Sequence, residues 1–143
     1  MSKKSIIIRI LIFLAWIGLL ALLCIKARSE ELNYIPGYAT AYHLKGITAS
    51  GEYVSEGICA SCKDRLGCTI ELYQRLPDGS VGDLIGTYIC KDTGGSDGIK
   101  KGKVIDVWRP NLEECQKFMD SVYADGCKGK VYILIKDTNM EVE

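Results

Sequence analysis

Residues 10–25 form an unbroken run of sixteen apolar residues, and this run is the feature that most constrains the fold. Lys3 and Lys4 stand before it, and Arg9 separates it from three further apolar residues. A helix over residues 6–25 would span about 30 Å, the thickness of a bilayer core. The basic residues in front predict that the N-terminus stays inside the cell. We therefore expect residues 1–28 to be a retained signal anchor, with a cleaved signal peptide as the alternative.

The remainder of the chain is predicted to be one exported domain, either membrane-anchored or secreted after cleavage. Residues 29–36 are polar and predict a linker, which leaves 37–143 for a domain large enough to have a hydrophobic core. Residues 1–28 hold five of the chain's 18 basic residues and none of its 18 acidic ones, so the rest carries a net charge of −5. This acidic balance argues against a nucleic-acid partner, because nucleic acids bind basic surfaces.

Short β-strands dominate the expected secondary structure. The segments with strand patterns are 38–42, 69–73, 84–90, 104–108 and 131–135. Pro77-Asp78-Gly79 predicts a turn, and residues 94–102 a loop. One helix is expected after Asn111, which can cap it, and before Gly126, a plausible stop. Many strands with a single helix favour a small β-barrel over an alternating α/β sheet.

Six cysteines lie in the predicted exported domain. They are Cys59, Cys62, Cys68, Cys90, Cys115 and Cys127. Because export permits disulfides and the number is even, we expect disulfide bonds. The alternatives are buried free thiols, or a redox pair or partial zinc site at Cys59 and Cys62.

Two aspartates are the strongest candidates for chemistry. Asp92 begins an Asp-Thr-Gly-Gly turn, and Asp106 lies inside the apolar segment 104–108. A carboxylate in an apolar strand is costly to bury unless it is hydrogen-bonded. Desolvation raises the pKa of such a group towards the range that a general acid needs at neutral pH. The alternative is that both aspartates are structural, satisfied by hydrogen bonds in turns.

A series of short segments resembles a known family. In chain order they are 48–51 (Thr-Ala-Ser-Gly), 66–69 (Leu-Gly-Cys-Thr), 92–95 (Asp-Thr-Gly-Gly), 99–102 (Ile-Lys-Lys-Gly) and 104–107 (Val-Ile-Asp-Val), after an opening strand with Ala-Thr-Ala-Tyr at 39–42. The series is similar to the three-Asp (3D) domain, found in membrane-bound lytic transglycosylase A and in small wall proteins of Gram-positive bacteria. It looks more distantly like rare lipoprotein A and the expansins. The resemblance implies a mainly β fold: a six-stranded double-psi β-barrel with one short α-helix, behind the N-terminal hydrophobic helix.

The resemblance also implies an activity. It makes Asp106 the general acid and base of a lytic transglycosylase that cleaves peptidoglycan between N-acetylmuramic acid and N-acetylglucosamine, with Asp92 as its supporting residue. No metal or organic cofactor is implied, and the partner is the glycan strand. The residues expected to bind the substrate are Thr48, Ser50, Thr93, Gly94, Gly95 and Trp108.

The chain departs from the family pattern at the third aspartate. The family has an Asp-Pro ahead of its Leu-Gly turn, whereas this chain has cysteines there and Asp64 as the nearest acid. This departure keeps two alternatives open. One is a non-catalytic barrel that binds wall glycan, as the expansin resemblance suggests, and the other is a disulfide or redox structural protein.

Overall fold

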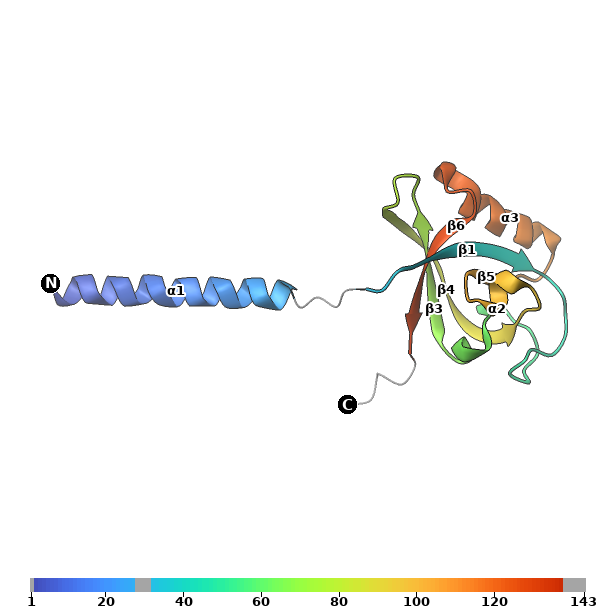
Figure 1. Cartoon of the computed structure of the whole chain (residues 1–143), viewed down its shortest axis with the longest axis horizontal. Coiled ribbons are helices and arrows are strands. Elements are labelled where there is room, and N and C mark those ends of the chain that lie inside the picture. Colours follow the sequence, from blue (N-terminus) through green and yellow to red (C-terminus); the bar gives the residue numbers. More distant parts are fainter. Residues whose placement is uncertain (1, 28–31, 138–143) are drawn as a thin grey trace. The chain divides into compact units, whose positions relative to one another are not determined.

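The computed structural model describes residues 2–27 and 32–137, which belong to two compact units that divide at residues 32 and 33 (Figure 1). The first unit is the helix α1 (Lys3–Ala27). Its segment Lys3–Leu22 has a mean hydropathy of 2.5 and is long and apolar enough to cross a membrane. A signal sequence has the same features, so the helix supports membrane anchoring or export without separating the two.

The second unit is a closed barrel of six strands. They are β1 (Ile35–Tyr42), β2 (Ile58–Ser61), β3 (Thr69–Arg75), β4 (Val81–Thr93), β5 (Val104–Trp108) and β6 (Lys130–Lys136). Around the barrel the order is β1-β5-β2-β4-β3-β6. The pairs β1–β5 and β2–β4 are parallel, and the other pairs are antiparallel. The predicted six-stranded, mainly β barrel behind an apolar helix is therefore confirmed.

Two strands differ from the expectation. β1 begins at Ile35, inside the predicted linker, and Pro36 pairs with Tyr132 of β6. Proline is tolerated there because β5 pairs with β1 only from Tyr38 onward, so the missing N–H faces no second strand. The sequence patterns also missed β2, whose four residues are all buried and show no alternation.

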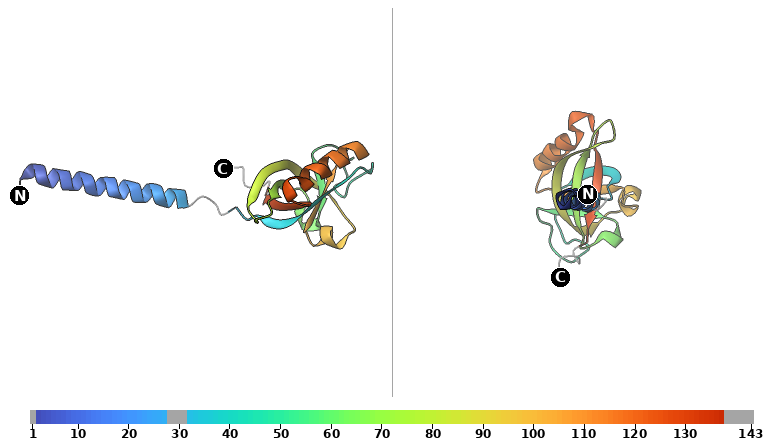
Figure 2. Two further views of the ribbon diagram at one scale, coloured as in Figure 1. Left: turned by 90° about the horizontal axis from the view of Figure 1, so that it is seen from above. Right: turned by 90° about the vertical axis from the view of Figure 1, so that its left-hand side faces the viewer.

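Within the second unit, the helices lie on the outside of the barrel (Figure 2). α3 (Leu112–Tyr123) begins as predicted, because the Asn111 side chain accepts a hydrogen bond of 2.9 Å from the Glu114 N–H. It ends before the predicted stop at Gly126. A second short helix, α2 (Asp97–Lys100), occupies the predicted loop 94–102, where burial of Ile99 stabilises a single turn. Two 3-10 turns, η1 (Lys63–Arg65) and η2 (Ala124–Gly126), complete the connections.

The hydrophobic core lies inside the barrel and beneath α3. Its largest fully buried side chains come from β3, β5 and β6, and α3 adds Phe118 and Val122. The buried residues of this cluster are Ala39, Cys59, Ile70, Leu72, Tyr88, Cys90, Ile105, Val107, Phe118, Val122, Val131 and Ile133. All of them lie in the second unit, so the barrel closes around a core of its own.

Candidate functional site

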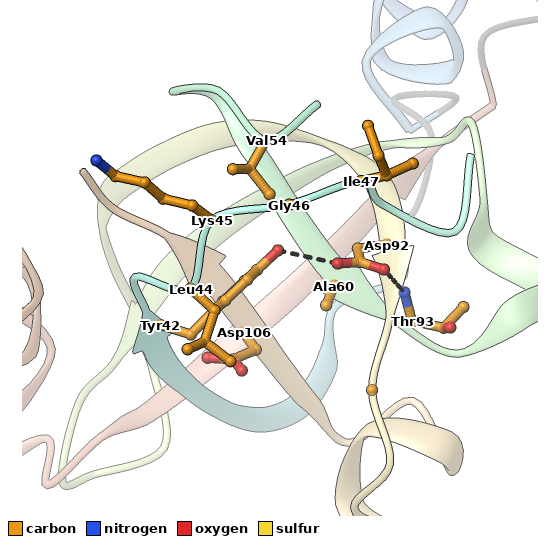
Figure 3. A pocket seen from close by; sticks show the side chains of 11 residues that line it. Tyr42, Leu44, Lys45, Gly46, Ile47, Val54, Ala60, Asp92, Thr93 and Asp106 are labelled. Atoms are coloured by element: carbon orange, nitrogen blue, oxygen red, sulfur yellow. Dashed lines mark hydrogen bonds between the residues drawn. The ribbon is translucent and has the colours of Figure 1, made fainter. Parts of the chain in front are cut away.

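A cavity of about 330 Å³ opens beside the strand ends of β1, β2, β4 and β5 (Figure 3). The loop that joins β1 to β2 forms one of its walls. The lining residues are Tyr42, Leu44, Lys45, Gly46, Ile47, Val54, Ala60, Asp92, Thr93, Gly94 and Asp106. Asp92 and Asp106, the two aspartates singled out from the sequence, both face this cavity.

The strand register explains why these aspartates meet. β2 lies between β4 and β5, and Ala60 of β2 pairs with Asp92 on one side and with Asp106 on the other. Neighbouring strands lie about 4.8 Å apart, so two strand spacings separate the two backbones by about 10 Å. Because Ala60 carries only a methyl group, the space between the carboxylates stays open.

Asp106 occupies a partly buried position on β5. The Thr40 hydroxyl, opposite it in the parallel β1–β5 pair, donates a hydrogen bond of 2.8 Å to Asp106 Oδ1. Burial raises the pKa of Asp106 above its ordinary value, the Thr40 hydrogen bond opposes this rise, and the nearby charge of Asp92 adds to it. Within residues 2–27 and 32–137, Asp106 Oδ2 accepts no hydrogen bond, which leaves it available to a ligand in the cavity.

Asp92 is bound by the protein on both of its oxygens. Oδ1 accepts hydrogen bonds from the Ala49 N–H at 3.0 Å and the Thr93 N–H at 2.9 Å. Oδ2 accepts one from the Tyr42 hydroxyl at 3.3 Å. These bonds tie the β1–β2 loop, the end of β4 and the end of β1 to a single carboxylate. Asp92 therefore organises the cavity wall, whereas Asp106 presents a free oxygen.

Tyr42 is a site residue that was not among the predicted catalytic and substrate-binding residues. It ends β1, lines the cavity and donates to Asp92. Burial, followed by the charge of Asp92 and the hydrogen bond to it, raises the pKa of the Tyr42 hydroxyl well above its ordinary value. The phenol thus stays protonated and remains a donor. The sequence signal that could have identified Tyr42 is its position two residues after Thr40, because alternate residues of a strand lie on the same face.

The predicted substrate-binding residues fall into two groups. Thr93 and Gly94 line the cavity, and Gly95 is exposed beyond it. Thr48 is buried and bonded within its own loop, to the Glu52 carbonyl and the Ser50 hydroxyl, each at 2.9 Å. Thr48 and Ser50 therefore shape the β1–β2 loop and do not line the cavity.

Trp108 also supports the β1–β2 loop. Its side chain is buried with Val54 and Ile58, and its indole N–H donates to the Leu44 carbonyl at 2.9 Å. Asp64, the acid nearest to the family's third aspartate, is an exposed residue of η1 and does not line the cavity. The site thus contains two of the three aspartates that the family pattern would supply.

The expected disulfides are absent from residues 32–137, where all six cysteines are free thiols. Cys59, Cys90, Cys115 and Cys127 are buried and pack as small apolar side chains. Cys59 pairs in register with Cys90, and not with Cys62. Contact with the Cys90 thiol, together with burial, raises the pKa of Cys59. The prediction of disulfides was wrong because an even cysteine count carries no information about packing.

Over residues 2–27 and 32–137, no group of three or more His, Cys, Asp or Glu side chains is placed to hold a metal ion. Comparisons of the chain with protein-family models, curated proteins and solved structures found no match. The closed barrel behind an apolar helix is compatible with the 3D-domain resemblance, and the family remains a prediction from the motifs.

Proposed function

We propose that the barrel is an extracytoplasmic, lytic transglycosylase-like enzyme that cleaves peptidoglycan glycan strands. One observation carries this proposal: a partly buried aspartate, Asp106, faces an open cavity with one oxygen held by Thr40 and the other free. Burial raises its pKa, which favours the protonated acid that leaving-group departure requires.

The proposed reaction needs one acid that later acts as a base. Protonated Asp106 donates its proton to the glycosidic oxygen as the bond from that oxygen to C1 of N-acetylmuramic acid breaks. The 6-hydroxyl of the same sugar then forms a bond to C1 and gives its proton to the Asp106 carboxylate. The products are a 1,6-anhydro end and a free N-acetylglucosamine hydroxyl. Because the nucleophile belongs to the substrate, no second carboxylate is needed to activate water.

Asp92 supports this role in two ways. Its hydrogen bonds hold the loop that walls the cavity, and its charge raises the pKa of Asp106. A proton on Asp92 Oδ2 would compete with the hydrogen bond that the Tyr42 hydroxyl donates to that oxygen. This difference in hydrogen bonding supports Asp106 as the acid and Asp92 as the positioning residue.

A second candidate is a non-catalytic barrel that binds wall glycan. The observation that favours it is an apolar rim on the β1–β2 loop, where Leu44, Ile47 and Tyr53 are 75%, 69% and 60% exposed. Apolar and aromatic surfaces of this kind stack against sugar rings. Binding on such a rim would require no acid at Asp106.

The test compares the full-length chain in a non-ionic detergent with its Asp106→Asn and Asp64→Asn variants. Asp64→Asn is the matched control because it also removes one carboxylate, outside the cavity. Each protein is incubated with purified sacculi, and soluble products are read by mass spectrometry. We expect anhydro-muropeptides from the wild type and from Asp64→Asn, and none from Asp106→Asn.

Each of the other outcomes would contradict a different part of the proposal. Anhydro products from Asp106→Asn would refute the assignment of the acid. Hydrated sugar ends would indicate a hydrolase in which a water molecule attacks C1. No product from any variant, with protein retained on the sacculi and lost after Tyr53→Ala and Leu44→Ala, would establish the binding barrel.

A further inference from the structure

A second cavity of about 400 Å³ lies away from the aspartates and shares no lining residue with their site. Its lining residues come from β3 and the β3–β4 hairpin on one side, and from the turn after η2 and β6 on the other. The lining residues are Arg75, Leu76, Pro77, Gly79, Gly126, Cys127, Lys128, Lys130 and Tyr132. Three of these nine residues are cationic and none is acidic.

The three cations lack carboxylate partners. In the described part of the chain, the ion pairs involve Lys91, Lys117 and Lys136, and none involves Arg75, Lys128 or Lys130. The two acids that flank the cavity in sequence are engaged elsewhere. Asp78 accepts from the backbone and hydroxyl of Ser80, and Asp125 accepts from Gln74. The lining of the cavity thus contains three unpaired cations and no acid, in a domain whose net charge is negative.

Arg75 is held in place without using its N–H groups. Its guanidinium carbon lies 5.7 Å from the centre of the Tyr38 ring and 5.8 Å from that of Tyr132. Such cation–π contacts orient the planar group and leave its N–H edge free for bidentate binding of an oxyanion. Within residues 2–27 and 32–137, the Arg75 guanidinium donates no hydrogen bond.

The walls of the cavity are fixed by close contacts between its two sides. The Tyr132 hydroxyl donates to the Gly79 carbonyl and ties β6 to the hairpin. Gly126, at a φ of +75°, lies so close to Pro77 that an added Cβ would stand 3.2 Å from the proline ring. Lys128 itself adopts a left-handed backbone with a φ of +54°. The cationic groups are thus presented by a preformed frame.

We propose that this cavity binds the phosphate group of a small sugar or polyol phosphate ester. Three cations exceed what one singly charged carboxylate requires, whereas a phosphate ester carries close to two charges and three acceptor oxygens. The volume accommodates the phosphate and a small polyol, since ligand cavities begin at about 300 Å³. The site is independent of Asp106, so either proposal can fail without the other.

The test measures binding to the full-length chain in a non-ionic detergent by titration calorimetry. The probes are glycerol 3-phosphate, inorganic phosphate and glycerate, a carboxylate of similar size. We expect saturable binding of glycerol 3-phosphate that is at least roughly tenfold tighter than that of glycerate, and tighter than that of inorganic phosphate. Increasing salt should weaken the binding, because the cations are partly exposed.

Variants locate the binding. Lys128→Gln with Lys130→Gln, and separately Arg75→Gln, should each weaken glycerol 3-phosphate binding roughly tenfold or more. Lys63→Gln with Lys101→Gln is the matched control, since it removes two exposed lysines elsewhere and should leave the affinity unchanged. Thermal unfolding of each variant verifies that it is folded, and Arg75→Lys tests the bidentate contact.

Three results would overturn the proposal. Equal affinity for glycerate and glycerol 3-phosphate would show that the cavity does not select phosphate. Equal affinity for inorganic phosphate and glycerol 3-phosphate would show that the cavity does not recognise the polyol. Binding that survives in the folded Arg75 and lysine variants would place the phosphate elsewhere on the chain.

Discussion

Replacing Thr40 by valine removes the single hydrogen bond that the described residues make to the Asp106 carboxylate, with almost no change in side-chain shape. The bond is 2.8 Å long and joins directly opposed residues of β1 and β5. A hydrogen bond to an ionised group contributes about 1.5–3 kcal/mol to stability, and one between neutral groups about 0.5–1.5 kcal/mol. The cost of Thr40→Val should therefore depend on whether Asp106 is ionised.

The sign of the pH dependence follows from the raised pKa of Asp106. A carboxyl group whose pKa is higher in the folded state stabilises the fold at low pH. This stabilisation is lost as the pH rises through the folded-state pKa. Thr40 limits the loss because it favours the ionised form, so in Thr40→Val the pKa of Asp106 should rise further. The stability difference between wild type and variant should then widen with increasing pH.

Thermal unfolding of the full-length chain in detergent, followed by circular dichroism across the carboxyl titration range, measures this effect. At about 4 °C per kcal/mol for a domain of this size, the melting temperature of Thr40→Val should fall by about 6–12 °C where Asp106 is ionised, and by about 2–6 °C where it is protonated. Thr40→Ser keeps the hydroxyl, so the difference between its melting temperature and that of the wild type should depend little on pH. A difference that is constant with pH, or larger in acid, would refute this account of Asp106.

Three further substitutions test other parts of the site. Ala60→Leu should fill the space between the carboxylates, lower turnover on sacculi more than roughly tenfold, and cost about 1–3 kcal/mol in chemical unfolding through overpacking. Asp92→Asn removes the charge that raises the pKa of Asp106, so that pKa should fall in a carbon-13 NMR titration, and the high-pH limb of activity should move to lower pH. Tyr42→Phe deletes the donor to Asp92 and should cost about 1 kcal/mol in urea unfolding, without moving the wild-type pH profile as far as Asp92→Asn does.

The sequence predicts the elements of this fold better than their pairing. The apolar segment 104–108 is strand β5 with the predicted bounds, and the Asn111 cap begins α3 as expected. Both signals are local, because they depend on residues adjacent in the chain. By contrast, β2 is a four-residue strand buried along its whole length, and a short run such as Ile-Cys-Ala-Ser has no periodicity to detect.

The geometry of the site depends on how distant strands pair, which no local sequence pattern specifies. The sequence indicated that Asp92 and Asp106 matter, and the structure brings them to one cavity. No local pattern states that Ala60 lies between them, because that register arises from two strands far away in sequence. The roles of Thr48 and Trp108 were equally hidden, since hydroxyls and indoles that shape a loop have the same sequence signature as those that contact a sugar.

The different environments of the two aspartates follow from their places on the barrel. Asp106 lies within a central strand between β1 and β2, so its side chain is partly desolvated and meets a strand neighbour, Thr40. Asp92 lies near the end of β4, beside the β1–β2 loop, where backbone N–H groups need acceptors outside the sheet. Its carboxylate accepts from Ala49 of that loop and from Thr93 at the end of β4. The carboxylate of Asp92 is therefore committed to these N–H groups, whereas Asp106 keeps one oxygen open to the cavity, and this contrast is the basis for proposing Asp106 as the acid.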